Sequence, residues 1–419
     1  MKRYLWVAII GGCLAAGSSV YTAPAPAATA PVPTFAKDVA PILYKNCTDC
    51  HRPTMFAPMS LLTYDEVRPW ARAIKQRVSR REMPPWHADN APGVFKNDPR
   101  LAQKDIDTIA AWVDGGAPLG NAKDLPPAPN YNDGGWTIGT PDLVLTMPEE
   151  YHIPADGLVP YLNFRIPTGL TEDKWIQAYE FRPSNRGIVH HIVASAVPAN
   201  SQPNAVDEAG GGRNSIGNLV PSRPGVVLPQ GVAKLLPANS EIVLQMHYTT
   251  NGTPQSDRTS VGLIFAKQPP KQVVGGGGGG TNNTFVIPAG AANYEVSAKR
   301  KLPEDTTLLA MMPHMHVRGK DMTYIAHYPD GRSETLLSVP RYDFRWQTTY
   351  ELAQPKVLPK GTELEVIAHF DNSAGNKDNP DPTHEVRWGD QTWEEMMIGS
   401  MTTIRDFTPE ASPRRSLQQ

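Results

Sequence analysis

The chain has 419 residues, including 42 prolines and 34 glycines, and a formal net charge of -2 at pH 7. This length exceeds that of a single hydrophobic core and predicts two to three domains. The near-zero charge gives no electrostatic basis for binding nucleic acid, and the many prolines and glycines favour β structure and turns over a helical bundle.

The N-terminus has the pattern of an export signal. Two basic residues precede the apolar run from Tyr4 to Ala16, which is too short for a membrane span. We expect a signal peptide over residues 1–27 and a periplasmic or secreted mature protein with no transmembrane span. In an alternative interpretation, Cys13 is the lipidated residue of a lipoprotein and anchors the protein to a membrane.

The motif CTDCH predicts one covalently bound c-type haem. Cys47 and Cys50 have the spacing that attaches to the two haem vinyl groups, and His51 follows as the iron ligand. The third cysteine lies in the leader, so the mature chain has no structural disulfide. The alternatives are a chance cysteine pair or a redox dithiol, and a dithiol lacks the thioredoxin-like context in which it usually occurs.

Two predicted helices frame this motif and indicate a small all-α cytochrome c domain over residues 33–120. Apolar residues at helical spacing follow a capping threonine before the motif, and a second apolar face precedes a glycine pair. These residues are Thr34, Phe35, Val39, Ile42 and Leu43 in the first helix, and Ile106, Ile109, Ala110 and Val113 in the second.

The sixth iron ligand must come from between these helices, where the candidates are Met55, Met59, Met83 and His87. We favour Met83, because two prolines follow it and would stiffen its loop. A thioether ligand would also raise the reduction potential and suit electron transfer. If Met83 only packs on the haem edge, His87 is the next candidate.

The remainder of the chain predicts antiparallel β structure. Residues 121–135 are rich in Pro, Asn, Asp and Gly and indicate a linker, after which short alternating apolar runs recur between turn signals. We expect two all-β, jelly-roll-like sandwich domains over residues 136–270 and 285–410. A glycine-rich linker or flexible loop over 271–284 would join them, and residues 411–419 would form a tail.

Histidines in the β region fall into two groups. His190 and His191 are adjacent, so on a regular strand they point to opposite faces, and only a bulge or a strand end would direct both to one metal ion. His314 and His316 are two residues apart, and on a strand they share a face. Each histidine taken alone is more often structural than metal-binding.

Four segments resemble those of a known enzyme family. NRGIVHHIV, LQMHYTTNG, PHMHVRGK and WEEMMIGSM occur in the same order as the metal-binding segments of the copper type II, ascorbate-dependent monooxygenases. That family includes peptidylglycine α-hydroxylating monooxygenase and dopamine β-monooxygenase. The resemblance covers roughly residues 136–407.

The resemblance implies two copper ions. His190, His191 and His247 would bind the first, and His314, His316 and Met396 the second, with Met397 as an alternative to Met396. Imidazole with thioether ligation suits copper that cycles between Cu(I) and Cu(II). Gln245 also matches a family position.

The chain also departs from the family. Met311, Met312 and Pro313 stand where the peptide-processing member has a substrate-binding arginine, which makes a peptide substrate doubtful. The animal enzymes are rich in disulfides, and this chain has none.

A copper monooxygenase is the function that the resemblance implies. It would hydroxylate a C–H bond of a small organic substrate with dioxygen at the His314, His316 and Met396 site. The haem would deliver electrons from an external cytochrome, quinol-linked or ascorbate-like reductant. The alternative is a non-catalytic periplasmic cytochrome that transfers electrons or binds copper. A haem peroxidase is disfavoured, because only one haem motif is present and Met83 would fill the open iron position.

Overall fold

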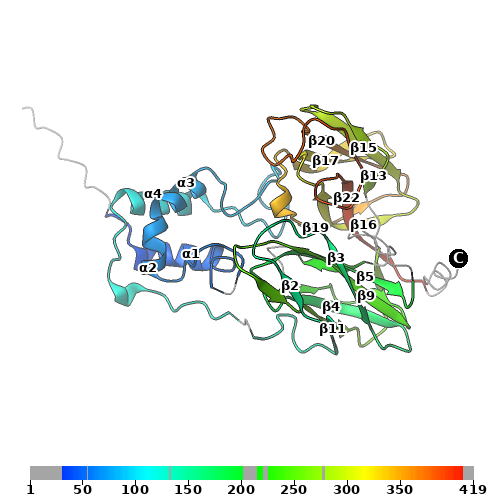
Figure 1. Ribbon diagram of the computed structural model, residues 1–419, viewed down its shortest axis with the longest axis horizontal. Helices are drawn as coiled ribbons and strands as arrows, with labels where there is room; N and C mark the ends of the chain where they lie inside the picture. Colours follow the sequence, from blue (N-terminus) through cyan, green and yellow to red (C-terminus); the bar gives the residue numbers. More distant parts are fainter. Residues whose placement is uncertain are drawn as a thin grey trace, which may run out of the picture. The chain divides into compact units, whose positions relative to one another are not determined.

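Helices occupy the first part of the chain and strands the remainder (Figure 1). The computed structural model describes residues 31–53, 55–131, 134–201, 215–219, 225–275 and 279–408. The expected signal peptide, Cys13 and the tail at 411–419 lie outside the described residues. Within the described ranges, no helix is both long enough and apolar enough to cross a membrane.

The helical region consists of short helices around one apolar core. Phe35, Leu43, Ile109 and Trp112 are fully buried in this core. The helices are a π-helical turn (Phe35–Val39), α1 (Ala40–Asn46), α2 (Tyr64–Val67), α3 (Ala71–Ser79) and α4 (Gln103–Asp114), with 3-10 turns at Arg68–Trp70 and Ala122–Asp124.

Both predicted helices are present, with differences in detail. Thr34 occupies the N-cap position, but its side chain does not cap the helix; the Asp38 carboxylate accepts a hydrogen bond from the Thr34 amide instead. In α4, Trp112 is buried together with Ile106 and Ile109, whereas Ala110 and Val113 are only partly buried. The indole Nε1 of Trp112 donates to the Pro118 carbonyl, which satisfies its polar atom inside the core.

A ten-stranded sheet runs through both parts of the β region. Its main path is β1 (Leu143–Thr146), β11 (Ser260–Phe265), β4 (Lys174–Arg182), β8 (Val232–Leu236), β12 (Gln272–Gly275), β22 (Met397–Asp406), β16 (Thr306–His314) and β19 (Tyr350–Leu358), with β7 (Gly225–Val227) on β4 and β13 (Gly280–Asn282) on β22.

The loop expected over residues 271–284 is therefore wrong in part. β12 and β13 lie in this range, and β12 pairs in parallel with β8 and antiparallel with β22. Glycines weaken a strand, but backbone pairing on both sides of β12 offsets this. At Gly280, a Cβ would come within 3.1–3.2 Å of Ala298 and Val366, which is a tight contact. The strands on either side of this range thus belong to one hydrogen-bonded sheet.

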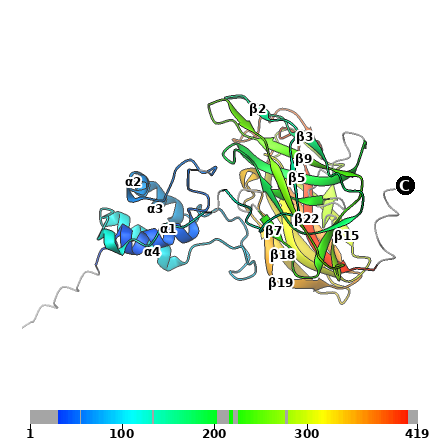
Figure 2. The ribbon, with the colours of Figure 1, turned by 90° about the horizontal axis from the view of Figure 1, so that it is seen from below.

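Two four-stranded antiparallel sheets complete the main architecture. One contains β3 (Leu162–Pro167), β9 (Ser240–Tyr248), β5 (Val189–Pro198) and β6 (Ser215–Leu219), and Figure 2 shows β3, β9 and β5 side by side. The other contains β15 (Tyr294–Lys301), β20 (Glu363–Phe370), β17 (Gly319–His327) and β18 (Ser333–Val339). Two small pairs are β2 (Tyr151–Ile153) with β10 (Gln255–Asp257) and β14 (Val286–Ile287) with β21 (Val386–Arg387).

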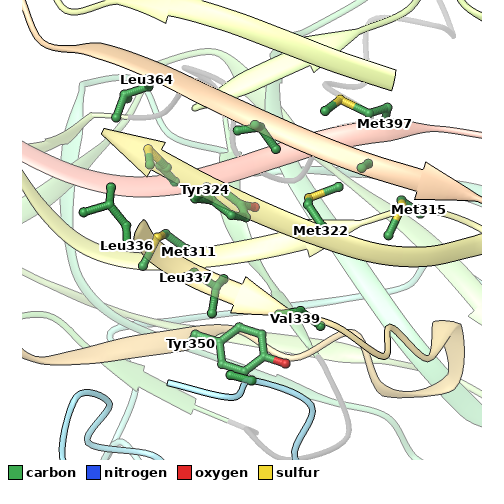
Figure 3. Packing of buried hydrophobic residues seen from close by; sticks show 14 of the residues in the cluster. Met311, Met315, Met322, Tyr324, Leu336, Leu337, Val339, Tyr350, Leu364 and Met397 are labelled. Carbon is green, nitrogen blue, oxygen red and sulfur yellow. The ribbon is translucent and has the colours of Figure 1, made fainter. Parts of the chain in front are cut away.

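Each four-stranded sheet shares an apolar core with one half of the long sheet. Buried residues of β5 and β9 pack with those of β1, β4 and β11. Buried residues of β17, β18 and β20 pack with those of β16 and β22, as Figure 3 shows for Tyr324, Leu337 and Met311. Alternation of buried and partly buried residues along β17 and β20 reflects this one-sided packing.

Residues 86–97 lie within the range expected for the cytochrome c domain. They pack instead on the apolar core that β17, β18 and β20 share with β16 and β22. Trp86 and Phe95 are buried against Tyr350, with ring centroids 4.9 and 5.5 Å from the Tyr350 ring. Asn97 exchanges hydrogen bonds with the backbone of Thr349 and Glu351. Residues 86–97, which lie between α3 and α4, therefore connect the helical region to the β region by direct contacts, and we name them the strap.

Candidate metal centre

A β-bulge directs the two adjacent histidines to the same site. β5 pairs with β9 so that His191 lies opposite His247, and the register shifts between Val189 and His191, which makes His190 the additional residue. A bulge redirects one side chain relative to the regular alternation. The bulge that the sequence required for a shared metal site is therefore present.

The Nδ1 atoms of the three histidines converge. His191 Nδ1 lies 3.0 Å from His190 Nδ1 and 3.3 Å from His247 Nδ1, and one nitrogen of each ring lies within 4.8 Å of the other two. A neutral imidazole has one N–H and one lone pair, so three such nitrogens cannot all hydrogen-bond to each other well. The three side chains could therefore hold one metal ion between them.

Burial keeps these histidines neutral. It lowers the pKa of His190 to about 4 and that of His247 to about 3, and it lowers the pKa of His191 well below its ordinary value. His190 Nε2 lies 3.1 Å from the Arg345 carbonyl, which can only accept, so Nε2 carries the proton. The lone pair of Nδ1 then faces the other histidines, in the protonation state that a metal ion requires.

A second histidine group follows the end of β16. His314 is the last residue of this strand, and His316 lies beyond it, so the expectation that both occupy a strand is wrong for His316. The two rings are nevertheless adjacent and perpendicular, with centroids 5.3 Å apart. The two side chains thus come together although His316 lies outside the strand.

In the second group, the Nδ1 atom of each histidine faces a hydrogen-bond acceptor. His314 Nδ1 lies 2.9 Å from Gln347 Oε1, and His316 Nδ1 lies 3.2 Å from the Glu394 carbonyl. Acceptors at Nδ1 leave the Nε2 atoms as lone-pair donors. His316 Nε2 is buried and has no hydrogen-bond partner among the described residues. Buried polar atoms without partners are rare, and a metal ion would satisfy this one.

Glu395 fixes the backbone around this group. Its fully buried carboxylate accepts hydrogen bonds from the amides of His316 at 2.8 Å, Arg318 at 2.6 Å and Met396 at 3.2 Å. Burial raises the pKa of Glu395 to about 8, against the opposing effect of these amides and of the Arg318 guanidinium. The carboxyl group connects the H-x-H segment to the methionine segment.

The environments of Met396 and Met397 differ. Met397 is part of the apolar core with Met322 and Met315 (Figure 3). Met396 is 3% exposed but is not a member of the described apolar cores, and its amide is bound by Glu395. The assignment of Met396 rather than Met397 as the ligand stays a prediction.

The two histidine groups face each other across shared aromatic rings. The Tyr161 ring lies 4.8 Å from the His247 ring and 6.4 Å from the His316 ring. Phe344 similarly lies 5.9 Å from His247 and 5.8 Å from His316. Burial raises the pKa of Tyr161 to about 12, so the hydroxyl of this side chain stays protonated at neutral pH.

The CTDCH motif forms a turn directly after α1. The amides of Cys50 and His51 donate to the Cys47 carbonyl at 3.2 and 2.9 Å, and both cysteines are free thiols. His51 Nδ1 lies 3.2 Å from the Met59 carbonyl, which leaves Nε2 as the free lone pair. This geometry suits a histidine that ligates iron.

Burial raises the pKa of the Cys47 thiol to about 12 and also raises that of Cys50. Reactive dithiols need an accessible thiolate of lowered pKa. The redox-dithiol alternative therefore has no support at this site.

The candidates for the sixth iron ligand differ in position. Met83 is partly buried in the loop after α3, directly before the strap. Met59 packs on the helical core but approaches His51 through its carbonyl. His87 is partly buried, and burial lowers its pKa. The assignment of Met83 stays a prediction.

Several residues of the centre were not identified from sequence. Tyr161, Phe344 and Gln347 carry no motif and lie far from the histidines along the chain, so only the fold brings them together. Glu395 could have been identified from sequence, because it directly precedes Met396 in the WEEMM segment.

Comparisons with known proteins do not identify the chain. No protein-family model matches it, and no curated protein matches it. Among solved structures, the major capsid protein P2 of bacteriophage PM2 is 7% identical with a TM-score of 0.26, over 62% of this chain and 99% of that one. A structure of infectious bursal disease virus, Gx strain, is 10% identical with a TM-score of 0.20, over 64% and 71% of the two chains. Allantoicase is 11% identical with a TM-score of 0.17, over 53% and 81%. These scores are too low to support an inference.

Proposed function

We propose that this protein is a copper-dependent monooxygenase that receives its electrons through a covalently bound c-type haem. The observation that carries the proposal is the pair of buried histidine groups of different composition, which face each other across Tyr161 and Phe344. The proposal also includes a fold of two β-sandwiches that follow a cytochrome c domain, export to the periplasm or exterior, and a small organic molecule as substrate.

The side chains fit the metal ions and the haem. His190, His191 and His247 would hold one copper ion through Nδ1 atoms, and His314, His316 and Met396 the other, where the buried Nε2 of His316 lacks a partner among the described residues. Neutral imidazoles with one thioether suit copper better than zinc or magnesium. Cys47, Cys50 and His51 would hold the haem.

Copper at these sites would supply one-electron redox steps and the activation of dioxygen. The chain itself would hold the ligands neutral by burial, fix the His316 and Met396 segments through Glu395, and limit access of water to the centre. Arg318 supports this arrangement, because its guanidinium donates to Asn372 Oδ1 and to the Trp393 carbonyl.

Reconstitution followed by a substrate screen tests the proposal. The mature chain should bind one haem and two copper ions, and the reduced protein should consume dioxygen with a matching small organic substrate. Copper and haem binding without product formation from any substrate would favour the alternative, a non-catalytic electron-transfer or copper-binding cytochrome. Failure to bind copper would contradict the monooxygenase and the copper-binding alternative, and would leave an electron-transfer cytochrome.

A further inference from the structure

Residues 343–347, which we name the bridging segment, contact both histidine groups and the loop that follows the CTDCH motif. Phe344 lies 6.0 Å from the His190 ring and 5.8 Å from the His316 ring, and Gln347 Oε1 lies 2.9 Å from His314 Nδ1. The segment includes the 3-10 turn Phe344–Trp346, held by the Asp343 carboxylate, which accepts from the Arg345 amide. One short turn therefore connects parts of the molecule that are remote in sequence.

The haem-motif loop meets the bridging segment at an aromatic pair. Phe56, five residues after His51, has its ring centroid 6.0 Å from that of Trp346 in an edge-on arrangement. The Arg186 guanidinium lies 5.1 Å from the Phe56 ring centroid and donates a hydrogen bond to the Val189 carbonyl.

The other end of the route is a hydrogen bond to the three-histidine site. His190 Nε2–H donates to the Arg345 carbonyl at 3.1 Å, and Arg345 is covalently joined to Trp346. From the haem-motif loop to His190 the route thus comprises one ring contact, one peptide link and one hydrogen bond. His190 in turn contributes Nδ1 to the converging nitrogens.

We infer that the bridging segment is the junction through which electrons pass from the haem to the three-histidine copper site, with Trp346 as the point of entry opposite Phe56. This inference rests on the proposed function. In each transfer one ferrous haem iron becomes ferric and one Cu(II) at the three histidines becomes Cu(I). No bond is made or broken, and an external one-electron reductant restores the ferrous haem.

Single-turnover electron transfer in the fully loaded protein tests the junction. Without oxygen, flash photoreduction of the haem is followed by its optical band, and Cu(II) loss is followed by electron paramagnetic resonance. Trp346→Leu and Phe56→Leu should each slow haem reoxidation by about tenfold, with copper content and haem midpoint potential unchanged. Phe56→Tyr, which keeps the ring, should restore the rate.

Trp70→Leu is the matched control, because Trp70 is a 45% exposed tryptophan in the 3-10 turn Arg68–Trp70 of the helical region, outside the bridging segment and the CTDCH loop. If Trp346→Leu loses copper, Phe56→Leu carries the test from the haem side. Rapid transfer in the parent with unchanged rates in both leucine variants would overturn the junction alone. No transfer in the parent, despite bound haem and copper, would overturn the junction together with the proposed electron route.

Discussion

The two histidine groups are built in different ways. The three-histidine site lies on two directly paired strands, and a single bulge in β5 completes it. The second group combines the end of β16, the segment before β22 and Gln347 from the bridging segment. Sheet pairing fixes the first site locally, whereas the second depends on Glu395 and on contacts between segments remote in sequence.

This difference suggests a division of roles. A site held by paired strands keeps its ligands in place as the oxidation state of its metal changes, which suits electron acceptance. A site assembled from separate segments can adjust its geometry when a ligand binds. Substitutions that affect one site and not the other test whether the two sites differ in this way.

The largest expected effect is that of His191→Ala. His191 is the central member of the first group, with its Nδ1 close to those of both His190 and His247. The variant should lose the copper of this site and retain that of the second, as metal analysis and copper spectroscopy would show. His369→Ala is the control, because the His369 ring lies 2.7 Å from Asp321 in the other four-stranded sheet and its loss should leave both coppers in place. Loss of both coppers from His191→Ala would show that the sites are not independent.

Glu395→Leu should have the next largest effect. It leaves three amides without their acceptor, and each buried unpaired group costs about 1–3 kcal/mol. We expect the free energy of unfolding to fall by at least about 3 kcal/mol in urea titrations and the second site to lose copper before the first. Glu394→Gln, which preserves the backbone carbonyl that faces His316, should retain both coppers. Unchanged copper binding in Glu395→Leu would contradict the positioning role of this carboxyl group.

The two neighbouring methionines should separate stability from metal binding. Met397→Ala removes a fully buried core side chain and should lower the free energy of unfolding by about 2–5 kcal/mol while both coppers remain. Met396→Ala should instead weaken Cu(I) binding at the second site and remove the sulfur contribution from its X-ray absorption spectrum. The reverse pattern would assign Met397 as the ligand.

The smallest expected effect is that of Gln347→Leu. Residues that orient a ligand through its second nitrogen typically contribute about 10- to 100-fold to metal affinity, and Gln347 occupies this position for His314. We expect a loss at the lower end of that range at the second site only, as measured by competition with a Cu(I) chelator. An equal loss at the three-histidine site would indicate that the bridging segment couples the two sites.

The pairs His190 with His191 and His314 with His316 could be predicted from sequence because each pair is local. His247 was joined to the first pair only through the family resemblance, since it lies 56 residues from His191 in the chain. The sequence also showed that His190 and His191 need a bulge, although the bulge depends on the register with β9 and lies beyond local pattern. Residues 86–97 were assigned to the helical region, since nothing local indicates that Trp86 and Phe95 pack on Tyr350. Likewise, the glycines at 275 and 280 predicted a loop, whereas pairing with remote strands places both in the sheet.

Metal and haem content of the reconstituted mature protein tests the central claim most directly. Elemental analysis combined with the optical spectrum of the covalent haem should give two copper ions and one haem per chain. His191→Ala and Met396→Ala should each reduce the copper content or affinity of a different site. Haem binding without copper binding would contradict the proposed copper-dependent function. Copper binding that neither substitution changes would contradict the assigned ligands.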